Sequence, residues 1–510
     1  MKSSAEKTIF TIPKEITAIA KTLEKAGFEA YLIGGCVRDL LLKKKPKDWD
    51  FTTNATPEEI MKIFTNTFYE NEYGTVGVVN ENVSDASLDE TLKVVEVTPY
   101  RLEAKYSNKR HPDAVTFGKK LDDDLKRRDF TMNAVAMKIE RDSLTGENDG
   151  CEVVMVDLFD GQKDLREEII RAVGEPSARF AEDALRILRA IRFSAELSFE
   201  IETKTAEAIK ENARHLENIS AERIREEFSR ILLSDNPQKA LVLSHTLGVL
   251  PFVLPELEKG IGVKQNSAHS YDVWEHSLRT LQHSAKRNFS FEVRLAALLH
   301  DLGKIPARRW SEEKKDWTFY GHDVIGAKIA AKILARLKFS KKITDDVVKL
   351  VRWHMFFSDT EVITLSSVRR MIRNVGPENI WYLMDVRACD RIGTGRPKES
   401  PYRLRKYQAM VEEASRDPVS VSMLKINGEK IMMLTKLEPG PKIGFILHAL
   451  LEEVLEDPKL NTADYLEKRA GELAKLSDNE LKKVGQTAKD KKTKEEEKII
   501  KEIRDKYWVK

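Results

Sequence analysis

The segment YLIGGCVRDLLL, residues 31–42, contains the strongest signals for how the N-terminal part of this chain folds. Its apolar start predicts a strand, the Gly34–Gly35 pair predicts a turn, and the apolar residues after it follow the period of an amphipathic helix. A helix that begins at such a turn leaves backbone N–H groups open to a phosphate, and Arg38 in its first turn would reach the same anion. Taken alone, the segment is also compatible with a plain strand-to-helix turn.

Two aspartates follow in KDWDF, residues 47–51. In an extended strand, the two-residue spacing of Asp48 and Asp50 puts both carboxylates on one face. Carboxylates of this kind hold Mg²⁺ together with substrate phosphates, and a two-metal site would activate an attacking hydroxyl while holding a leaving pyrophosphate. For the DxD pattern alone, two solvated turn aspartates are the alternative.

The surrounding sequence changes character along the chain. Over the first ~165 residues, short apolar runs alternate with turn signals and helical patterns, which predicts a mixed sheet with helices packed on it. From Pro176 onward the apolar residues follow the helical period almost throughout, so the remainder is predicted to be mainly helical. The expected fold class is therefore α+β.

The composition limits the function classes. With 86 Lys+Arg against 83 Asp+Glu in 510 residues, the net charge is only +3, so any RNA-binding surface must be local. The three cysteines lie far apart, which argues against a disulfide framework or a cysteine zinc site and predicts a reducing cytoplasm. The N-terminus lacks the apolar core of a signal peptide, and no stretch approaches ~18 apolar residues, so we expect a soluble protein without membrane contacts.

Four motifs occur in a characteristic order: GGCVRDLLL, KDWDFTTNATPEE, LKRRDFTMNAVA and EDALRILRAIRF, within residues 34–193. Together they closely resemble bacterial class II CCA tRNA nucleotidyltransferases and their poly(A) polymerase relatives. The resemblance implies a Mg²⁺-dependent head that uses ATP and CTP, and tRNA as the partner. It assigns catalytic metal binding to Asp48 and Asp50, and nucleotide binding to Gly35, Arg38, Arg128 and Asn133.

A third group of candidate residues concerns base selection. In EDALRILRAIRF, the residues Asp183, Arg186, Arg189 and Arg192 recur every three positions, so on one helix they would drift slowly round one side. Cytosine and adenine both present an amine beside an unprotonated ring nitrogen, whereas uracil and guanine present a carbonyl beside an N–H. An aspartate acceptor beside an arginine donor would therefore accept C and A, and the resemblance gives this role to Asp183 and Arg186. An exposed i,i+3 salt bridge is the structural alternative.

A second candidate metal site lies further along the chain, where helical segments carry histidines and aspartates in the order H…HD…D. Imidazole and carboxylate ligands on helices can hold a divalent metal with open positions for water and phosphate. The pattern resembles the HD phosphohydrolase superfamily and implies the ligands His276, His300, Asp301 and Asp390. Asp385 competes with Asp390 for the last position, and His322 and His354 are either further ligands or substrate contacts.

Loop and charge signals along the chain, together with the resemblance, give the expected domain boundaries. They are a nucleotidyltransferase head at 1–170, a helical neck that binds the nucleobase and RNA at 171–262, an HD domain at 263–395, a helical C-terminal body at 396–486 and a charged tail at 487–510. Glu96 is expected on a strand beside the metal carboxylates, and the loop at 100–112 falls where the family keeps a flexible element for the switch to A. In VDLFDGQKDL, Leu158 and Asp160 depart from the family's proline and glycine, so that turn is expected to have a different shape.

The predicted function is template-independent addition of CCA to the 3′ end of tRNA from CTP and ATP, with release of pyrophosphate. Within the family, the alternative is a poly(A) polymerase or an A-adding enzyme. An HD-domain metal-dependent phosphohydrolase with an inactive head, acting on RNA ends or cyclic phosphates, is an alternative from another class. A non-catalytic RNA-binding module is a third, which intact Asp48, Asp50 and Arg128 disfavour.

Overall fold

The computed structural model describes residues 8–69, 74–80, 89–101, 117–143, 150–267, 269–356 and 363–481. Most of the loop predicted at 100–112, and the whole charged tail from 487, lie outside these residues. The chain divides into two compact units, one comprising residues 1–261 with 332–340 and the other residues 262–331 with 341–510. No helix among the described residues is long and apolar enough to cross a membrane.

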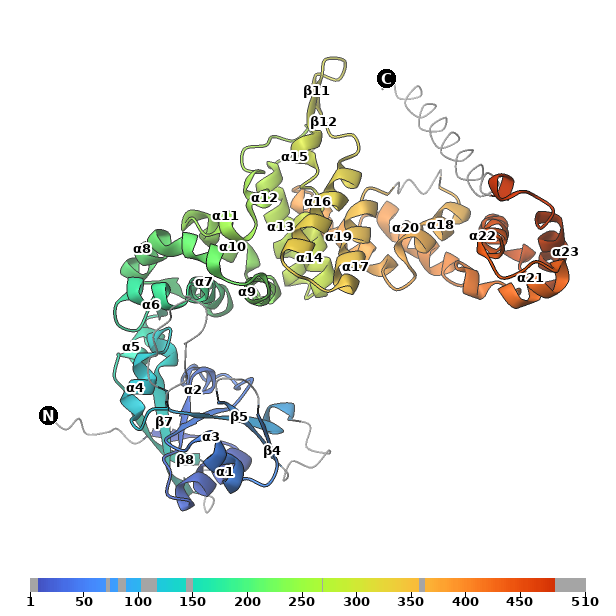
Figure 1. The fold of residues 1–510 in the computed structure, drawn as a ribbon. Coiled ribbons are helices and arrows are strands. Elements are labelled where there is room, and N and C mark those ends of the chain that lie inside the picture. The colour runs from blue at the N-terminus through green and yellow to red at the C-terminus, as the bar shows by residue number, and fades with distance from the viewer. Residues whose placement is uncertain are drawn as a thin grey trace. The chain divides into compact units, whose positions relative to one another are not determined.

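The first unit contains an eight-stranded sheet in the order β1-β8-β7-β2-β3-β6-β5-β4. Figure 1 labels its strands β4, β5, β7 and β8. Its strands are β1 Thr8–Phe10, β2 Tyr31–Ile33, β3 Asp50–Thr53, β4 Thr67–Tyr69, β5 Val76–Val79, β6 Val94–Pro99, β7 Val135–Ser143 and β8 Gly150–Asp157. Strands β3 and β6 are parallel and every other pair is antiparallel, so the predicted mixed sheet is confirmed.

Helices cover both faces of this sheet: α1 Lys14–Lys25, α2 Gly35–Leu41, α3 Pro57–Ile63 and α4 Leu121–Lys126. Side chains alternate along a strand, so neighbouring residues of β2 enter different cores. Leu32 packs with residues of α1, α2 and α3, whereas Ile33 packs with Leu121 and Leu125 of α4. The strand that leads into the Gly34–Gly35 turn is thus fixed from both sides.

The start of β3 corrects one prediction. Asp50 is the first residue of this strand, but Asp48 lies in a bend before it, so the two aspartates do not share one extended strand. The ladder with β6 begins after Asp48, because the first hydrogen bond runs from the N–H of Glu96 to the carbonyl oxygen of Trp49. In the register of the two strands Asp50 lies opposite Glu96, which confirms the expected neighbourhood of Glu96.

The turn after β8 shows how the chain accommodates its departures from the family pattern. Asp160 has φ 58° and ψ 31°, a left-handed conformation that aspartate tolerates better than most residues other than glycine. The carboxylate of Asp157 accepts the backbone N–H groups of Phe159, Gly161 and Gln162 and holds the turn closed. Leu158 is 44% exposed, so no proline is needed there for packing.

The rest of the first unit is helical apart from a short parallel pair, β9 Ile169–Ile170 and β10 Glu200–Ile201. Its helices are α5 Gly161–Arg166, α6 Pro176–Glu182, α7 Leu185–Leu197, α8 Thr203–Asn212, α9 Ala221–Leu233, α10 Pro237–Thr246, α11 Leu250–Val253 and α12 Pro255–Glu258. Ser220 precedes α9 as its N-cap residue, as predicted, but its side chain makes no capping hydrogen bond.

The second unit is mainly helical, as predicted. Its helices are α13 Val273–Lys286, α14 Phe291–Leu299, α15 Lys304–Ala307, α16 His322–Arg336, α17 Lys341–Trp353, α18 Leu365–Val375, α19 Ile380–Gly393, α20 Tyr402–Ala414, α21 Gly428–Thr435, α22 Pro441–Glu456 and α23 Ala463–Leu473. Helices α13, α14 and α19 pack against one another (Figure 1). A β-hairpin of β11 Arg309–Ser311 and β12 Asp316–Thr318 interrupts the helices, which the helical period did not predict.

Candidate functional sites

The two aspartates of the first unit both face the glycine turn. A Cβ atom added to Gly35 would lie 3.5 Å from Oδ1 of Asp48, and one added to Gly34 would lie 3.6 Å from Oδ2 of Asp50. Gly34 has φ +77°, which glycine adopts without strain. The turn and both carboxylates therefore come together although Asp48 lies outside the strand.

A cavity of about 790 Å³ opens at this turn. Its wall includes most of the residues predicted for the head: Gly35, Arg38, Asp48, Asp50, Arg128, Asn133, Arg189 and Arg192, together with Gly34, Glu96, Asp129 and Phe193. The carboxylates supply the oxygen ligands that Mg²⁺ prefers, and the guanidinium groups suit phosphates. The donor set thus fits a metal-bound nucleoside triphosphate.

Asp129, which the motif contains but sequence reasoning gave no role, organises this wall. One of its carboxylate oxygens accepts Nε–H of Arg189 at 2.7 Å, and the other accepts the side-chain amide of Asn133 at 3.3 Å. Burial alone would raise the pKa of Asp129, but the Arg189 guanidinium outweighs it and lowers the pKa to about 2. Asn133 in turn accepts from Arg38 at 3.1 Å, so these side chains form one connected polar network.

Asp183 and Arg186 do not share the helix that their spacing predicted, which is a second correction. Helix α6 ends at Glu182 and α7 begins at Leu185. Asp183 has an extended backbone, with φ −145° and ψ 101°, which ends α6. Its Oδ1 accepts the N–H of Leu185, the first residue of α7, at 3.0 Å.

These two residues also do not contact each other through their side chains in the described hydrogen bonds and ion pairs. Oδ2 of Asp183 accepts from Arg223 of α9 at 2.7 Å. Arg186 donates to Glu182 at 2.6 Å and to the carbonyl oxygen of Arg127 at 3.0 Å. Neither lines the 790 Å³ cavity, whereas Arg189 and Arg192, further along α7, do.

Arg192 is held firmly. It is buried, donates to Glu227 at 2.7 Å and to Glu196 at 3.1 Å, and its guanidinium lies 4.2 Å from the ring centroid of Phe193. Because these contacts restrain Arg192, its guanidinium group keeps a fixed place in the wall of the 790 Å³ cavity.

The second unit brings the four residues of the other predicted site into one buried cluster. His276 comes from α13, His300 and Asp301 follow α14, and Asp390 comes from α19. Their ligand atoms all lie within 4.8 Å of one another. Nε2 of His276 lies 3.0 Å from Asp301 and 3.3 Å from Asp390. Asp390, the residue preferred over Asp385, is the one in the cluster.

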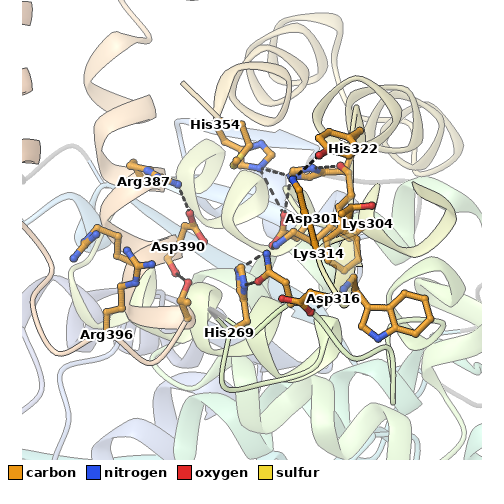
Figure 2. Close-up of a pocket in the computed structure, with 18 residues that line it drawn as sticks. His269, Asp301, Lys304, Lys314, Asp316, His322, His354, Arg387, Asp390 and Arg396 are labelled. Carbon is orange, nitrogen blue, oxygen red and sulfur yellow. Dashed lines mark hydrogen bonds and ion pairs between the residues drawn. The ribbon is translucent and has the colours of Figure 1, made fainter. Parts of the chain in front are cut away.

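Asp301 faces a second group as well. Its Oδ2 lies 3.3 Å from Nε2 of His300, whereas its Oδ1 lies 3.5 Å from His322 and 3.6 Å from His354. The carboxylate therefore joins two sets of imidazoles, and Figure 2 shows the set of His322 and His354 beside Asp301. His322 approaches closely because Gly303 has no side chain: a Cβ there would lie 2.0 Å from the carbonyl oxygen of His322.

Backbone contacts orient three of these imidazoles for metal binding. Nδ1 of His300, His322 and His354 lies 2.9, 2.8 and 2.7 Å from the carbonyl oxygen three residues before it. A carbonyl oxygen only accepts, so Nδ1 donates to it, and Nε2 is the ring nitrogen that faces the cluster and would bind a metal. Burial opposes a charge on His300, yet Asp301 and Asp390 raise its pKa to about 10, which shows how strongly the cluster attracts positive charge. The donor set fits a divalent metal ion.

Two basic residues beside this cluster were not predicted to be functional. Lys304 donates to Asp301 at 2.6 Å and to Gln265 at 2.7 Å, and Arg387 donates to Asp390 at 2.7 Å. Lys304 directly follows the His-Asp motif in HDLGK, so its place in the sequence was a signal. Arg387 precedes Asp390 by almost one helical turn. In the sequence, only the choice of Asp390 as the last residue of the H…HD…D pattern could have indicated Arg387 as its neighbour.

Three family models match the chain in succession. A model described as "Poly A polymerase head domain" matches residues 30–171, one described as "Probable RNA and SrmB- binding site of polymerase A" matches residues 198–261, and one described as "HD domain" matches residues 273–395.

Curated relatives match nearly the whole length. A CCA-adding enzyme of Lactobacillus helveticus (strain DPC 4571) is 32% identical over 451 residues, which cover 88% of this chain and 94% of the relative. A CCA-adding enzyme of Ligilactobacillus salivarius (strain UCC118) is 32% identical over 466 residues, 91% of this chain and 98% of the relative. Among solved structures, the Bacillus stearothermophilus CCA-adding enzyme in complex with CTP is 28% identical with a TM-score of 0.64, and the match covers 90% of this chain and 98% of that one.

Proposed function

Because this chain belongs to the CCA-adding enzyme family, we propose that it adds C, C and A to the 3′ end of tRNA from CTP and ATP. The observation that carries the proposal is the meeting of the Gly34–Gly35 turn with Asp48 and Asp50 in one cavity. The relatives matched over almost their full length are CCA-adding enzymes, which disfavours a poly(A) polymerase. The three cysteines are buried free thiols, in keeping with the reducing cytoplasm that we propose for the protein.

In the proposed reaction the 3′ hydroxyl of the RNA attacks the α-phosphorus of the nucleotide. The new P–O bond forms as the hydroxyl loses its proton to water and as the bond from the α-phosphorus to the oxygen that bridges it to the β-phosphorus breaks. Pyrophosphate leaves with the electron pair of that bond. Asp48 and Asp50 would hold Mg²⁺, which supplies charge stabilisation for the attacking and leaving oxygens. Gly35, Arg38 and Arg128 would bind the triphosphate, and the Asp129 network would keep Asn133 and Arg189 in place beside it.

We also propose the following domain boundaries. The head ends near residue 170, the neck runs over 171–262, the HD domain over 263–395 and the C-terminal body over 396–486. The neck and body would bind tRNA through its phosphates, so binding should weaken as salt rises.

Replacing Asp48 or Asp50 by Ala should abolish nucleotide addition and leave tRNA binding nearly unchanged, because the carboxylates act in the chemical step. Incorporation of labelled CTP and ATP, together with the Kd for tRNA, measures both effects. Asp122→Ala is the matched control, since Asp122 is an exposed aspartate of α4 in the same unit and does not line the cavity. Full activity of Asp48→Ala or Asp50→Ala would remove the active-site assignment.

The cluster in the second unit supports a second function, a metal-dependent phosphohydrolase. Asp301, His322, His354 and Asp390 line a cavity of about 420 Å³, whose wall also contains Lys304 and Arg387. A divalent metal held by the cluster would lower the pKa of a bound water. Water oxygen then bonds to phosphorus, the bond from phosphorus to the ester oxygen breaks, and a proton from the water passes to that oxygen. The basic side chains would hold the phosphate.

Changes to the cluster test this second function. His300→Ala with Asp301→Ala, and separately the milder Asp390→Asn, should lower metal-dependent phosphate release by about 100-fold or more and leave CCA addition within a few-fold. Asp385→Asn is the control, because Asp385 lies on the same helix outside the cluster. Phosphate release that survives both cluster variants would show that the site is misplaced, and a wild-type protein that releases no phosphate with any divalent metal would remove the function.

A further inference from the structure

Neither proposed function gives a role to the hairpin of β11 and β12 in the second unit. The hairpin lies between α15 and α16, and β12 ends shortly before His322. Trp310 and Trp317 lie opposite each other in the register of its two strands. Trp317 lines the 420 Å³ cavity together with Tyr320, which follows the hairpin and is 68% exposed. The ring of Trp310, which is 48% exposed, does not line it. Aromatic side chains and candidate metal ligands therefore share one cavity.

Trp317 is held in a fixed position. The Arg308 guanidinium lies 3.5 Å from the centroid of its ring, and the Trp310 ring meets it edge-on at 5.3 Å between centroids. Lys314, in the hairpin turn, donates to the hydroxyl of Tyr320 at 2.7 Å and lies over its ring. A ring that is already restrained loses little conformational freedom when a flat ligand packs against it.

The cavity carries positive charge opposite the hairpin. Arg387, Arg391 and Arg396 come from α19 and the turn after it, and Figure 2 shows Arg387 and Arg396 across the cavity from Asp316. Lys304 and Lys314 add two further cations to its wall. Guanidinium groups bind phosphate, whereas aromatic rings stack on nucleobases, so this wall combines the two contacts that a nucleotide needs. A volume of about 420 Å³ suits a ligand of the size of a single nucleotide.

We propose that Trp317 and Tyr320 bind the base of a ribonucleotide whose phosphate lies at the Asp301 cluster, and so select nucleotide phosphates over other phosphate esters. The proposal rests on the phosphohydrolase function of this cluster. Stacking on an aromatic ring does not depend on the hydrogen-bonding groups of the base, so we expect this preference for nucleotide phosphates with any base. The nucleotide is either free or the terminal residue of an RNA, because both present the same phosphate and base.

The test compares three phosphate monoesters with the full-length protein and Mn²⁺: adenosine 3′-monophosphate, a tRNA transcript that ends in a 3′-phosphate, and glycerol 2-phosphate. Trp317→Ala should lower kcat/KM for the nucleotide substrate by about 5- to 150-fold and leave glycerol phosphate within about twofold. Tyr320→Ala should act in the same direction. Release of inorganic phosphate is the readout, which nucleotide addition in the first unit does not produce from a monoester. The two nucleotide arms show which source is used.

Trp310→Ala is the matched control, because it breaks the cross-strand pair of the hairpin without removing a ring from the cavity. Equal losses for Trp310→Ala and Trp317→Ala, or an equal loss on glycerol phosphate, would mean that Trp317 only stabilises the hairpin and would overturn the proposal. If the wild type hydrolyses none of the esters, that result contradicts the phosphohydrolase function but does not decide whether the cavity binds a base. Base binding is then decided by quenching of tryptophan emission with adenosine 3′-monophosphate, which Trp317→Phe must reduce if the proposal holds and leaves unchanged if it does not.

Discussion

Asp183 is the residue whose surroundings bear most directly on the choice of C and A. Its carboxylate accepts hydrogen bonds from the N–H of Leu185 and from the guanidinium of Arg223. Arg186 is engaged with Glu182 and with backbone carbonyl oxygens. We propose that a base pairs with Asp183 and Arg186 by sharing these groups, since a carboxylate has about four acceptor positions and a guanidinium has five N–H donors.

Asp183→Asn separates this role from a structural one. The amide keeps an oxygen for Leu185 but replaces an acceptor by a donor, so the amine of C or A loses its partner while the carbonyl of U gains one. Addition of C and A should fall about ten- to hundred-fold, and the C-to-U ratio should narrow. Single-turnover incorporation of each NTP onto a tRNA lacking CCA measures this.

Arg223→Met is the control for this change, because it removes the ion pair and keeps the acceptor. If Asp183 only forms a salt bridge, Arg223→Met reproduces the full effect of Asp183→Asn, with a uniform loss for all four nucleotides. An unchanged C-to-U ratio in folded Asp183→Asn protein would exclude base reading.

At the scale of single elements, the sequence predicted what hydrophobic periodicity and turn residues determine. The strand, turn and helix of residues 31–42 appear as β2, Gly34 and α2, because alternation along β2 serves a core on each face of the sheet. Boundaries set by tertiary hydrogen bonds could not be predicted. Asp48 falls outside β3 because the ladder with β6 starts at Trp49. Helix α6 ends at Glu182 because Asp183 has an extended backbone and its carboxylate accepts the N–H of Leu185.

The hairpin of β11 and β12 was missed for a different reason. Its strands have only three residues each, too few for a period-2 pattern to stand out in a charged stretch, and cross-strand contact of Trp310 with Trp317 holds them together. The cluster residues His276, His300, Asp301 and Asp390 were predictable as residue types in a familiar order. The sequence could not predict that Asp301 also faces His322 and His354, because this contact depends on how the helices pack.

On the scale of the whole molecule, each compact unit contains one candidate centre made from its own residues. The cavity with Asp48 and Asp50 is lined by the first unit alone, and the cavity with Asp301 is lined by the second unit alone. We therefore expect the two activities to be separable by mutation. In the first activity, the head adds a defined sequence of nucleotides without a nucleic-acid template.

Three tRNA transcripts test that claim directly: one that ends at the discriminator base, one that ends after the first C and one that ends after CC. Each is incubated with the protein, Mg²⁺ and one NTP at a time, and the products are resolved to single nucleotides. We expect C alone on the first two transcripts, one A on the third, and no further extension. Repeated addition of A to all three transcripts, or addition of A to the third with no C added to the others, would contradict this expectation.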